Sequence, residues 1–278
     1  MKCSAPAKLN LTLRIRGRRA DGFHELETLM APLPGLADTL EIERDEFFSL
    51  EVEGVEVGPV EDNLVTRALR LFEKHTGRPC PYRITLKKRI PAGAGLGGGS
   101  SDAAATLRAL NKLEKVGLGD SELEALGARL GSDVPFFMRE GACWCRGRGE
   151  ILEGAEVDGH EVLLLKPAFG VNTVDAYGRW AGSEELPDVS YAPQRLGGLL
   201  LRNDLERPVF AKFLFLADLK MWLLEQVEVR AALMSGSGAT VFAVLDEAVE
   251  IESLAERART ELDPNLWWWG GSVNPGSP

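Results

Sequence analysis

The sequence predicts a protein of mixed strands and helices that is folded in two domains. Alternation of polar and apolar residues predicts strands, as at residues 8–15, and helical periodicity behind a polar cap predicts helices, as at 62–72. A chain of 278 residues is long enough for one large domain or two modest ones. The composition changes after a glycine-rich, basic segment at 142–149, so we predict one domain over 1–150 and another over 151–278.

The other elements follow from the same patterns. We expect antiparallel strands with one solvent-facing side at 38–43 and 48–54. We also expect strands at 82–88 and 162–167 and helices at 121–130, 216–225 and 247–262. Residues 181–198 are expected to be rich in loops. Trp267, Trp268 and Trp269 would form a sticky patch if exposed, so we expect some of them to dock on the second domain. We expect disorder from about residue 270 onward.

Composition excludes several classes of protein. Hydrophobic residues make up 45% of the chain and charged residues 27%, as in soluble globular proteins. No apolar run approaches the roughly 18 residues of a membrane span, and the N-terminus has no apolar signal core. The four cysteines form no C-x-x-C pair, which favours free thiols in the cytoplasm. A net charge of −10 argues against nucleic acid as the main partner, but it leaves small anionic ligands open.

The most informative stretch is glycine-rich and runs directly into an alanine-rich segment. Its residues are Pro91, Ala92, Gly93, Ala94, Gly95, Leu96, Gly97, Gly98, Gly99, Ser100 and Ser101. Glycine adopts positive φ and lets another group approach the backbone, Ser and Asp cap helices, and Ala favours them. The stretch therefore predicts a loop that opens a helix. The free N–H groups and the dipole of such a helix start bind phosphate.

Three other interpretations of this stretch are weaker. A Walker A loop needs a lysine after the glycines, and none follows here. The glycines do match G-x-G-x-x-G, but the preceding segment, 87–91, is a poor buried parallel strand for a dinucleotide-binding fold. A flexible linker would not be followed at once by an alanine-rich helix.

Polar side chains at two other places could contact a ligand. Lys8 and Asn10 lie on the same face of the strand predicted at 8–15, which could equally be a solvated face. Phe23 and His24 follow an Asp-Gly turn, where a ring and an imidazole are well placed to touch a ligand. Taken alone, His24 would more simply be an ordinary surface or core histidine.

Asp133 is the candidate carboxylate. It precedes Val134, Pro135 and two phenylalanines, and a carboxylate in such apolar company is costly unless it has a partner. It could also be a helix N-cap, because Asp at the N-cap with Pro near the first helical position is typical of a helix start. The two interpretations are compatible.

Together these features resemble the GHMP kinases, a family of small-molecule kinases. The motifs that carry the resemblance are the opening 5–11, the glycine–serine loop and a second glycine turn at 234–239. Segments 17–26 and 131–137 and the form of the loop resemble the branch that phosphorylates a cytidine diphosphate-linked polyol in the non-mevalonate isoprenoid pathway. The resemblance covers residue 5 to about residue 245, in order, and the joint match is highly specific.

The resemblance implies an α+β fold of two domains with the active site in the cleft between them. ATP would lie over residues 91–101 with Asn63 beside the adenine, and Asp133 and Lys8 would be catalytic. The acceptor would be bound by Asn10, Phe23, His24, Thr173 and Tyr177. The family usually has Tyr where this chain has Phe23, His24 would recognise the cytosine, and the match at 172–177 is looser.

The resemblance also implies Mg²⁺ with ATP, held mainly by phosphates and water, so we assign no metal ligand in the protein. We expect a monomer or homodimer.

Two alternative functions stay open: a GHMP kinase for another alcohol, such as mevalonate or homoserine, and a non-catalytic RNA-binding protein of related fold. The aromatic segment at 23–24 speaks against the first, because such alcohols have no base to stack. The net charge of −10 and the presence of Lys8 and Asp133 speak against the second.

Overall fold

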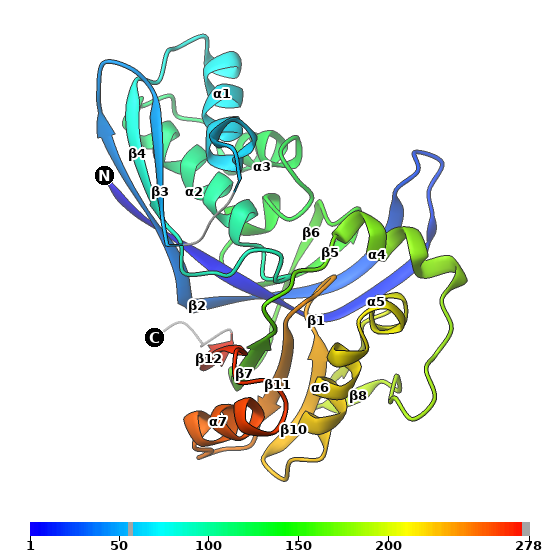
Figure 1. Cartoon of the computed structure of the whole chain (residues 1–278). Helices are drawn as coiled ribbons and strands as arrows, with labels where there is room; N and C mark the ends of the chain where they lie inside the picture. Colours follow the sequence, from blue (N-terminus) through cyan, green and yellow to red (C-terminus); the bar gives the residue numbers. More distant parts are fainter. Residues whose placement is uncertain (55–57, 274–278) are drawn as a thin grey trace.

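The computed structural model describes residues 1–54 and 58–273 (Figure 1). Its strands and helices in chain order are β1 (Lys2–Arg18), β2 (His24–Arg44), β3 (Ser49–Glu53), α1 (Leu64–Thr76), β4 (Tyr82–Lys87), α2 (Gly98–Leu113), α3 (Asp120–Ala128), β5 (Ala142–Gly147), β6 (Ile151–Ala155), β7 (His160–Lys166), α4 (Thr173–Arg179), β8 (Gln194–Leu196), β9 (Leu199–Leu201), α5 (Glu206–Lys212), α6 (Leu214–Leu224), β10 (Val229–Met234), β11 (Val241–Leu245), α7 (Ile251–Glu261) and β12 (Trp267–Val273). Short 3₁₀ turns connect some of them.

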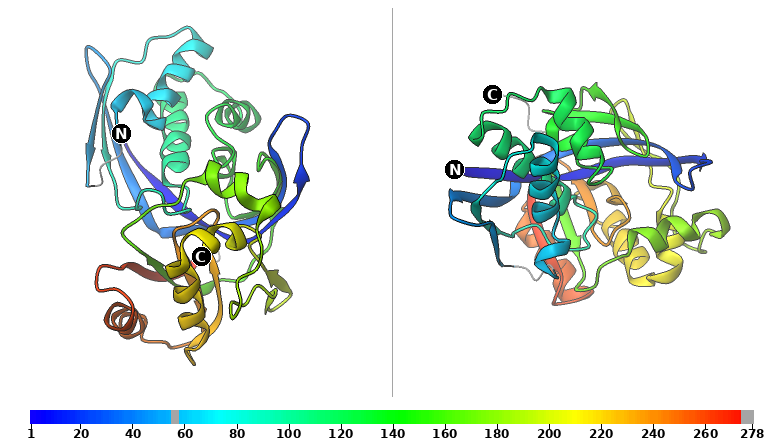
Figure 2. Two further views of the ribbon diagram at one scale, coloured as in Figure 1. Left: turned by 45° about the vertical axis from the view of Figure 1, so that its right-hand side comes forward. Right: turned by 90° about the horizontal axis from the view of Figure 1, so that it is seen from above.

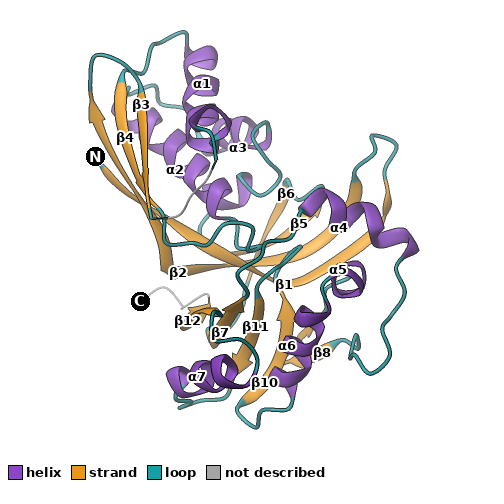
Figure 3. Cartoon of the chain, viewed as in Figure 1, coloured by secondary structure: helices purple, strands orange, loops and turns teal. Residues whose placement is uncertain are grey.

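The first sheet is built around a long antiparallel hairpin of β1 and β2. Its strand order is β3-β4-β2-β5-β6, with β1 also paired to β2. Helices α1, α2 and α3 lie together on one side of this sheet (Figure 3). All neighbouring pairs are antiparallel except β3 and β4. The predicted strands at 38–43 and 48–54 are therefore present but not adjacent, because β4 lies between them.

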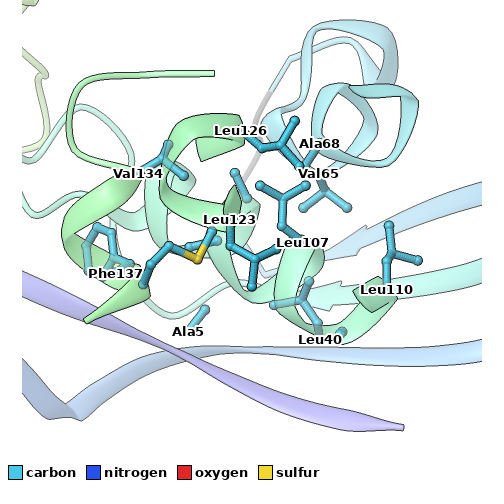
Figure 4. Packing of buried hydrophobic residues seen from close by; sticks show 14 of the residues in the cluster. Ala5, Leu40, Val65, Ala68, Leu107, Leu110, Leu123, Leu126, Val134 and Phe137 are labelled. Atoms are coloured by element: carbon cyan, nitrogen blue, oxygen red, sulfur yellow. The ribbon is translucent and has the colours of Figure 1, made fainter. Parts of the chain in front are cut away.

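The core of the first domain forms where the helices cover the sheet. Leu107 and Leu110 of α2 pack with Leu123 and Leu126 of α3 above Leu40 of β2 (Figure 4). These side chains are at most 5% exposed, because each helix turns its apolar stripe toward the strands. This packing fixes α2, whose first residues end the glycine loop.

The second sheet has the strand order β10-β11-β7-β12 and is entirely antiparallel. Leu9 and Leu11 of β1 share a buried cluster with Leu164 of β7 and Phe242 of β11, so the two domains pack against each other through β1 (Figure 2). Alternation along a strand then places Lys8 and Asn10 on the opposite face of β1. The hydrophobic pattern of this strand thus decides which side chains face away from the interdomain core.

The tryptophan segment differs in part from the prediction. Trp267–Val273 forms strand β12, which pairs with β7 over its whole length. Trp268 packs on the core of the second domain, and Trp267 and Trp269 pack on the cluster between the domains, so the docking prediction is confirmed. Disorder from about residue 270 is wrong for 270–273, because these residues make ladder contacts with β7. Residues 274–278 lie outside the described residues.

The first sheet also extends beyond the expected boundary. We placed that boundary after residue 150, whereas β6 pairs with β5 as far as Ala155 and the second sheet begins at His160. Helix α3 ends at Ala128, ahead of the predicted limit. Within residues 1–54 and 58–273, no helix combines the length and apolar character that crossing a membrane requires.

Candidate active site

Both domains line one cavity of about 1050 Å³. The first domain contributes the glycine loop and residues of β1 and β2, and the second contributes residues of α4 and the glycine turn that follows β10. The helix α4 lies over the hairpin of β1 and β2 in Figure 1. Such a cavity at a domain interface, partly apolar and with converging polar groups, is typical of a small-molecule site.

The glycine loop does open a helix, as predicted. Helix α2 begins at Gly98, and its N-cap residue Gly97 has φ 74° and no side chain that could accept the first N–H groups. A Cβ at Gly97 would lie 2.9 Å from the ring of Phe137 and 3.1 Å from the Lys8 side chain. Only glycine fits this position. The uncapped N–H groups at the start of α2 are therefore available to an anion in the cavity.

The glycine loop is joined to the glycine turn of the second domain by backbone hydrogen bonds and through the Gly95 carbonyl group. The Gly95 carbonyl oxygen accepts hydrogen bonds from Ser235 Oγ and Lys8 Nζ, both at 3.1 Å. A Cβ at Gly95 would lie 2.2 Å from the Ser235 carbonyl oxygen. Close backbone approach therefore fixes the two loops against each other.

Lys8 and Asp133 meet at the wall of the cavity. Lys8 Nζ lies 3.3 Å from Asp133 Oδ2, and the side chains are 4% and 32% exposed. The 3₁₀ turn Pro135–Met138 has Val134 as its N-cap residue, without a side-chain capping bond. The N-cap interpretation of Asp133 is therefore wrong, and its carboxylate is partnered by the lysine.

Asn10 holds Lys8 from the other side. Asn10 Oδ1 accepts a hydrogen bond from Lys8 Nζ at 2.5 Å, and Asn10 Nδ2 donates to Thr28 Oγ1 at 2.8 Å. Thr28 Oγ1 in turn donates to the Thr12 carbonyl oxygen at 2.7 Å. This chain of bonds fixes the orientation of the amide, so that its oxygen faces the ammonium group.

A cluster of aromatic side chains lines another part of the cavity. The rings of His24 and Tyr177 are 5.3 Å apart and tilted by 30°, and Trp180 meets His24 edge-on at 5.8 Å. Burial lowers the pKa of His24, and the charge of Arg18 lowers it further. The imidazole is therefore neutral near pH 7, with one nitrogen that donates and one that accepts.

The other predicted residues also surround the cavity, with one exception. Phe23 is 51% exposed, with the Arg148 guanidinium 4.7 Å from its ring centroid. Thr173 Oγ1 lies 2.9 Å from Ser237 Oγ, and Asn63 lines the cavity while it caps α1 through the Val65 N–H. Ser101 does not line the cavity, because it is 1% exposed within α2.

Several residues of the site were not predicted from the sequence, among them Thr28, Arg148, Trp180 and Ser235. Ser235 lies in the second glycine motif, and Arg148 lies in the glycine-rich basic segment, so both had a signal in the sequence. Thr28 and Trp180 had none, because their roles depend on pairing of β1 with β2 and on the position of α4.

Comparison with known proteins identifies the family. The model of the GHMP kinases N terminal domain matches residues 63–141, and that of the GHMP kinases C terminal domain matches residues 192–263. A 4-diphosphocytidyl-2-C-methyl-D-erythritol kinase from Methylacidiphilum infernorum is 39% identical, over 95% of this chain and 93% of its own length. Another from an Anaeromyxobacter species is 42% identical, over 86% of this chain and 79% of its own.

Solved structures agree with these matches. The crystal structure of a 4-(cytidine 5'-diphospho)-2C-methyl-D-erythritol kinase superposes with a TM-score of 0.79 at 35% identity, covering 99% of this chain and all of the other. The Methanococcus jannaschii mevalonate kinase, at 13% identity and a TM-score of 0.67, shares the fold. The chain therefore belongs to the GHMP kinases and, among them, to the family of 4-diphosphocytidyl-2-C-methyl-D-erythritol kinases.

Proposed function

We propose that the chain transfers the γ-phosphoryl group of ATP to a hydroxyl of 4-diphosphocytidyl-2-C-methyl-D-erythritol, the compound in its relatives' names. The products would be the 2-phosphate and ADP, in the non-mevalonate isoprenoid pathway. The observation that carries the proposal is the Lys8–Asp133 pair, 3.3 Å apart in the cavity that the glycine loop also lines. A base beside a phosphate-binding loop is the minimum that such a transfer needs.

Phosphoryl transfer depends on positioning and on neutralisation of the charge on the phosphates more than on covalent chemistry. The N–H groups at the start of α2 supply hydrogen bonds and the positive end of a helix dipole. The Asp133 carboxylate accepts the proton of the attacking hydroxyl, and the Lys8 ammonium group orients it. Lys8 is itself held by Asn10 and the Gly95 carbonyl oxygen, so the pair is fixed before the substrate arrives.

The donor groups in the cavity suit Mg²⁺. The Ser100 hydroxyl lines the cavity at the start of α2 and is a hard oxygen donor, and Mg²⁺ bound with ATP needs few protein ligands. This hydroxyl would hold the ion together with the phosphates and water. When bound, it would neutralise part of the charge on the phosphates.

The cluster of aromatic side chains around His24 supports the proposal that the substrate carries a base. A cytosine between aromatic faces gains roughly 1–3 kcal/mol of stacking energy. The neutral His24 offers a donor and an acceptor to the edge of the base. Binding energy at this remote end would position the reacting hydroxyl toward Asp133. A cytoplasmic location and a monomeric or dimeric state remain predictions.

The experiment that tests the proposal compares acceptors. ADP release by the purified chain would be measured with the cytidylated substrate, with methylerythritol phosphate, with mevalonate and with homoserine. We expect kcat/KM for the cytidylated substrate to exceed that for methylerythritol phosphate by about 10²-fold, because the latter lacks the stacking base. Equal values would contradict the cytidine assignment, and preference for mevalonate or homoserine would make the chain a different GHMP kinase.

A further inference from the structure

Three ionisable side chains are buried together under the glycine loop. Asp38 of β2 is fully buried, and the side chains of Lys88 and Asp102 are 5% and 3% exposed. Lys88 and Asp102 also line the cavity, but none of the three side chains has a role in the proposed reaction. Burying charges is costly unless each has a close partner, so their arrangement calls for an explanation.

Asp38 holds the segment through which the chain enters the loop. One of its carboxylate oxygens accepts hydrogen bonds from the backbone N–H groups of Arg89 and Ile90, directly before the loop begins at Pro91. Its other oxygen accepts a hydrogen bond from Lys88 Nζ. A fully buried side chain of the central hairpin thus fixes both the backbone and the lysine at this point.

Lys88 also holds the segment through which the chain leaves the loop. Its Nζ donates to Asp102 Oδ2 at 2.8 Å, and Asp102 lies just after the first turn of α2. The lysine reaches this carboxylate by passing close to Gly98, where a Cβ would lie 3.2 Å from Nζ. One ammonium group therefore connects the two ends of the loop.

We propose that Asp38, Lys88 and Asp102 form a clamp that positions the glycine loop, so that the N–H groups at the start of α2 are aligned for the phosphates of ATP before the nucleotide binds. The residues act through the backbone of the loop and are positioning residues. This inference rests on the proposed function, because it takes ATP as the ligand of the loop.

Two features favour positioning over a simple contribution to stability. Buried ion pairs are often no more stabilising than apolar side chains of similar size, so stability alone does not account for three buried ionisable groups. The clamp also joins β2 and α2 at the two ends of the loop, whereas the apolar core beneath α2 contains residues of the helix and none of residues 91–97. Misplacement of such groups by about 1 Å can lower their effectiveness by as much as 10²-fold.

Asp102→Ala tests the clamp, because it leaves Lys88 paired with Asp38 and introduces a good helix former. Two measurements are made without acceptor: the Kd for ATP by calorimetry and amide hydrogen exchange over residues 93–98. We expect the Kd to rise about 10-fold and the loop amides to exchange faster. Asp102→Asn, which keeps an acceptor oxygen for Lys88, should stay close to wild type in both. Leu110→Ala is the control on the same helix: it removes core packing and lowers the Tm but should leave the Kd unchanged.

Three outcomes would overturn the clamp. The Kd of Asp102→Ala could equal that of wild type. It could fall, which would make Asp102 only a repulsive charge near the phosphates. It could also rise no further than in Leu110→Ala, which would reduce the role to stability. If wild type itself bound no ATP, the proposed function would fail together with this inference, whereas ATP binding unaffected by Asp102→Ala would remove the inference alone.

Discussion

Lys8 and Asp133 come from the two ends of the first domain and meet only in the folded chain. Their catalytic roles were implied by the family resemblance. The residues alone indicated only that the Asp133 carboxylate needs a partner, because Lys8 could equally have lain on a solvated strand face. The hydrogen bonds that fix them were not predictable. They require Thr28 of β2 opposite β1 and Ser235 from the other domain, and strand alternation specifies neither partner.

His24→Ala tests base recognition. The substitution removes the imidazole that lies beside the Tyr177 ring and would offer a donor and an acceptor to the base. We expect kcat/KM for the cytidylated acceptor to fall at least about 10-fold, while the Kd for ATP stays within twofold of wild type. His75→Ala is the matched control: this histidine lies on α1 and does not line the cavity. Equal losses in the two variants, or a large change in ATP binding in His24→Ala, would contradict the assignment.

Asp102 makes the stability of the fold depend on pH in a defined direction. Burial raises the pKa of Asp102 to about 7; the Lys88 ammonium group opposes this rise and the Asp38 carboxylate adds to it. The folded-state pKa lies above the unfolded value of 3.8. At pH values between these two pKa values, the folded chain therefore binds a proton that the unfolded chain has lost. The contribution of Asp102 to stability is therefore lost as the pH rises through about 7.

The measurement is the Tm of wild type and of Asp102→Asn at several pH values between about 5 and 8. The amide in the variant cannot ionise, so the Tm difference should move in favour of the variant as the pH increases. A difference that is constant over this range, or that moves in favour of wild type, would contradict the raised pKa.

At the scale of elements, most strands and helices were predictable because each shows its own period of apolar residues. Which strands pair with one another was less predictable. The pattern of β3 fits any neighbour, and only the structure shows β4 between it and β2. Similarly, Gly270, Gly271 and Ser272 have the composition of a linker but form an edge strand, because β7 offers them a free ladder of backbone groups.

Gly97→Val tests the junction of the loop and α2. Valine disfavours the φ of 74°, and its side chain would collide with Phe137 and Lys8. We expect the affinity for ATP to fall at least about 10-fold, since the N–H groups of the helix start would be displaced. Gly154→Ala is a suitable control: nothing lies within 4 Å of its Cβ, and it is outside the cavity. Unchanged ATP affinity in Gly97→Val, measured by calorimetry, would move the phosphate site elsewhere.

At the scale of the whole molecule, the site exists because two sheets pack through β1. The face of β1 that carries Leu9 and Leu11 joins the domains, so the opposite face, with Lys8 and Asn10, is turned to the cavity. The resemblance in sequence implied a cleft between two domains, and the cavity lies between them as implied. The positions of Trp180 and Arg148 in it depend on how α4 and the segment after β5 come together, which no local pattern encodes.

The central claim is that this cavity transfers phosphate to an alcohol with Asp133 as the base. The most direct test follows labelled γ-phosphate from ATP to the cytidylated acceptor in wild type and in Asp133→Asn, with the Kd for ATP measured on the same samples. We predict that wild type forms the labelled product, and that the variant binds ATP equally well but turns over about 10²-fold or more slowly. A folded Asp133→Asn protein with near-normal turnover would contradict the claim.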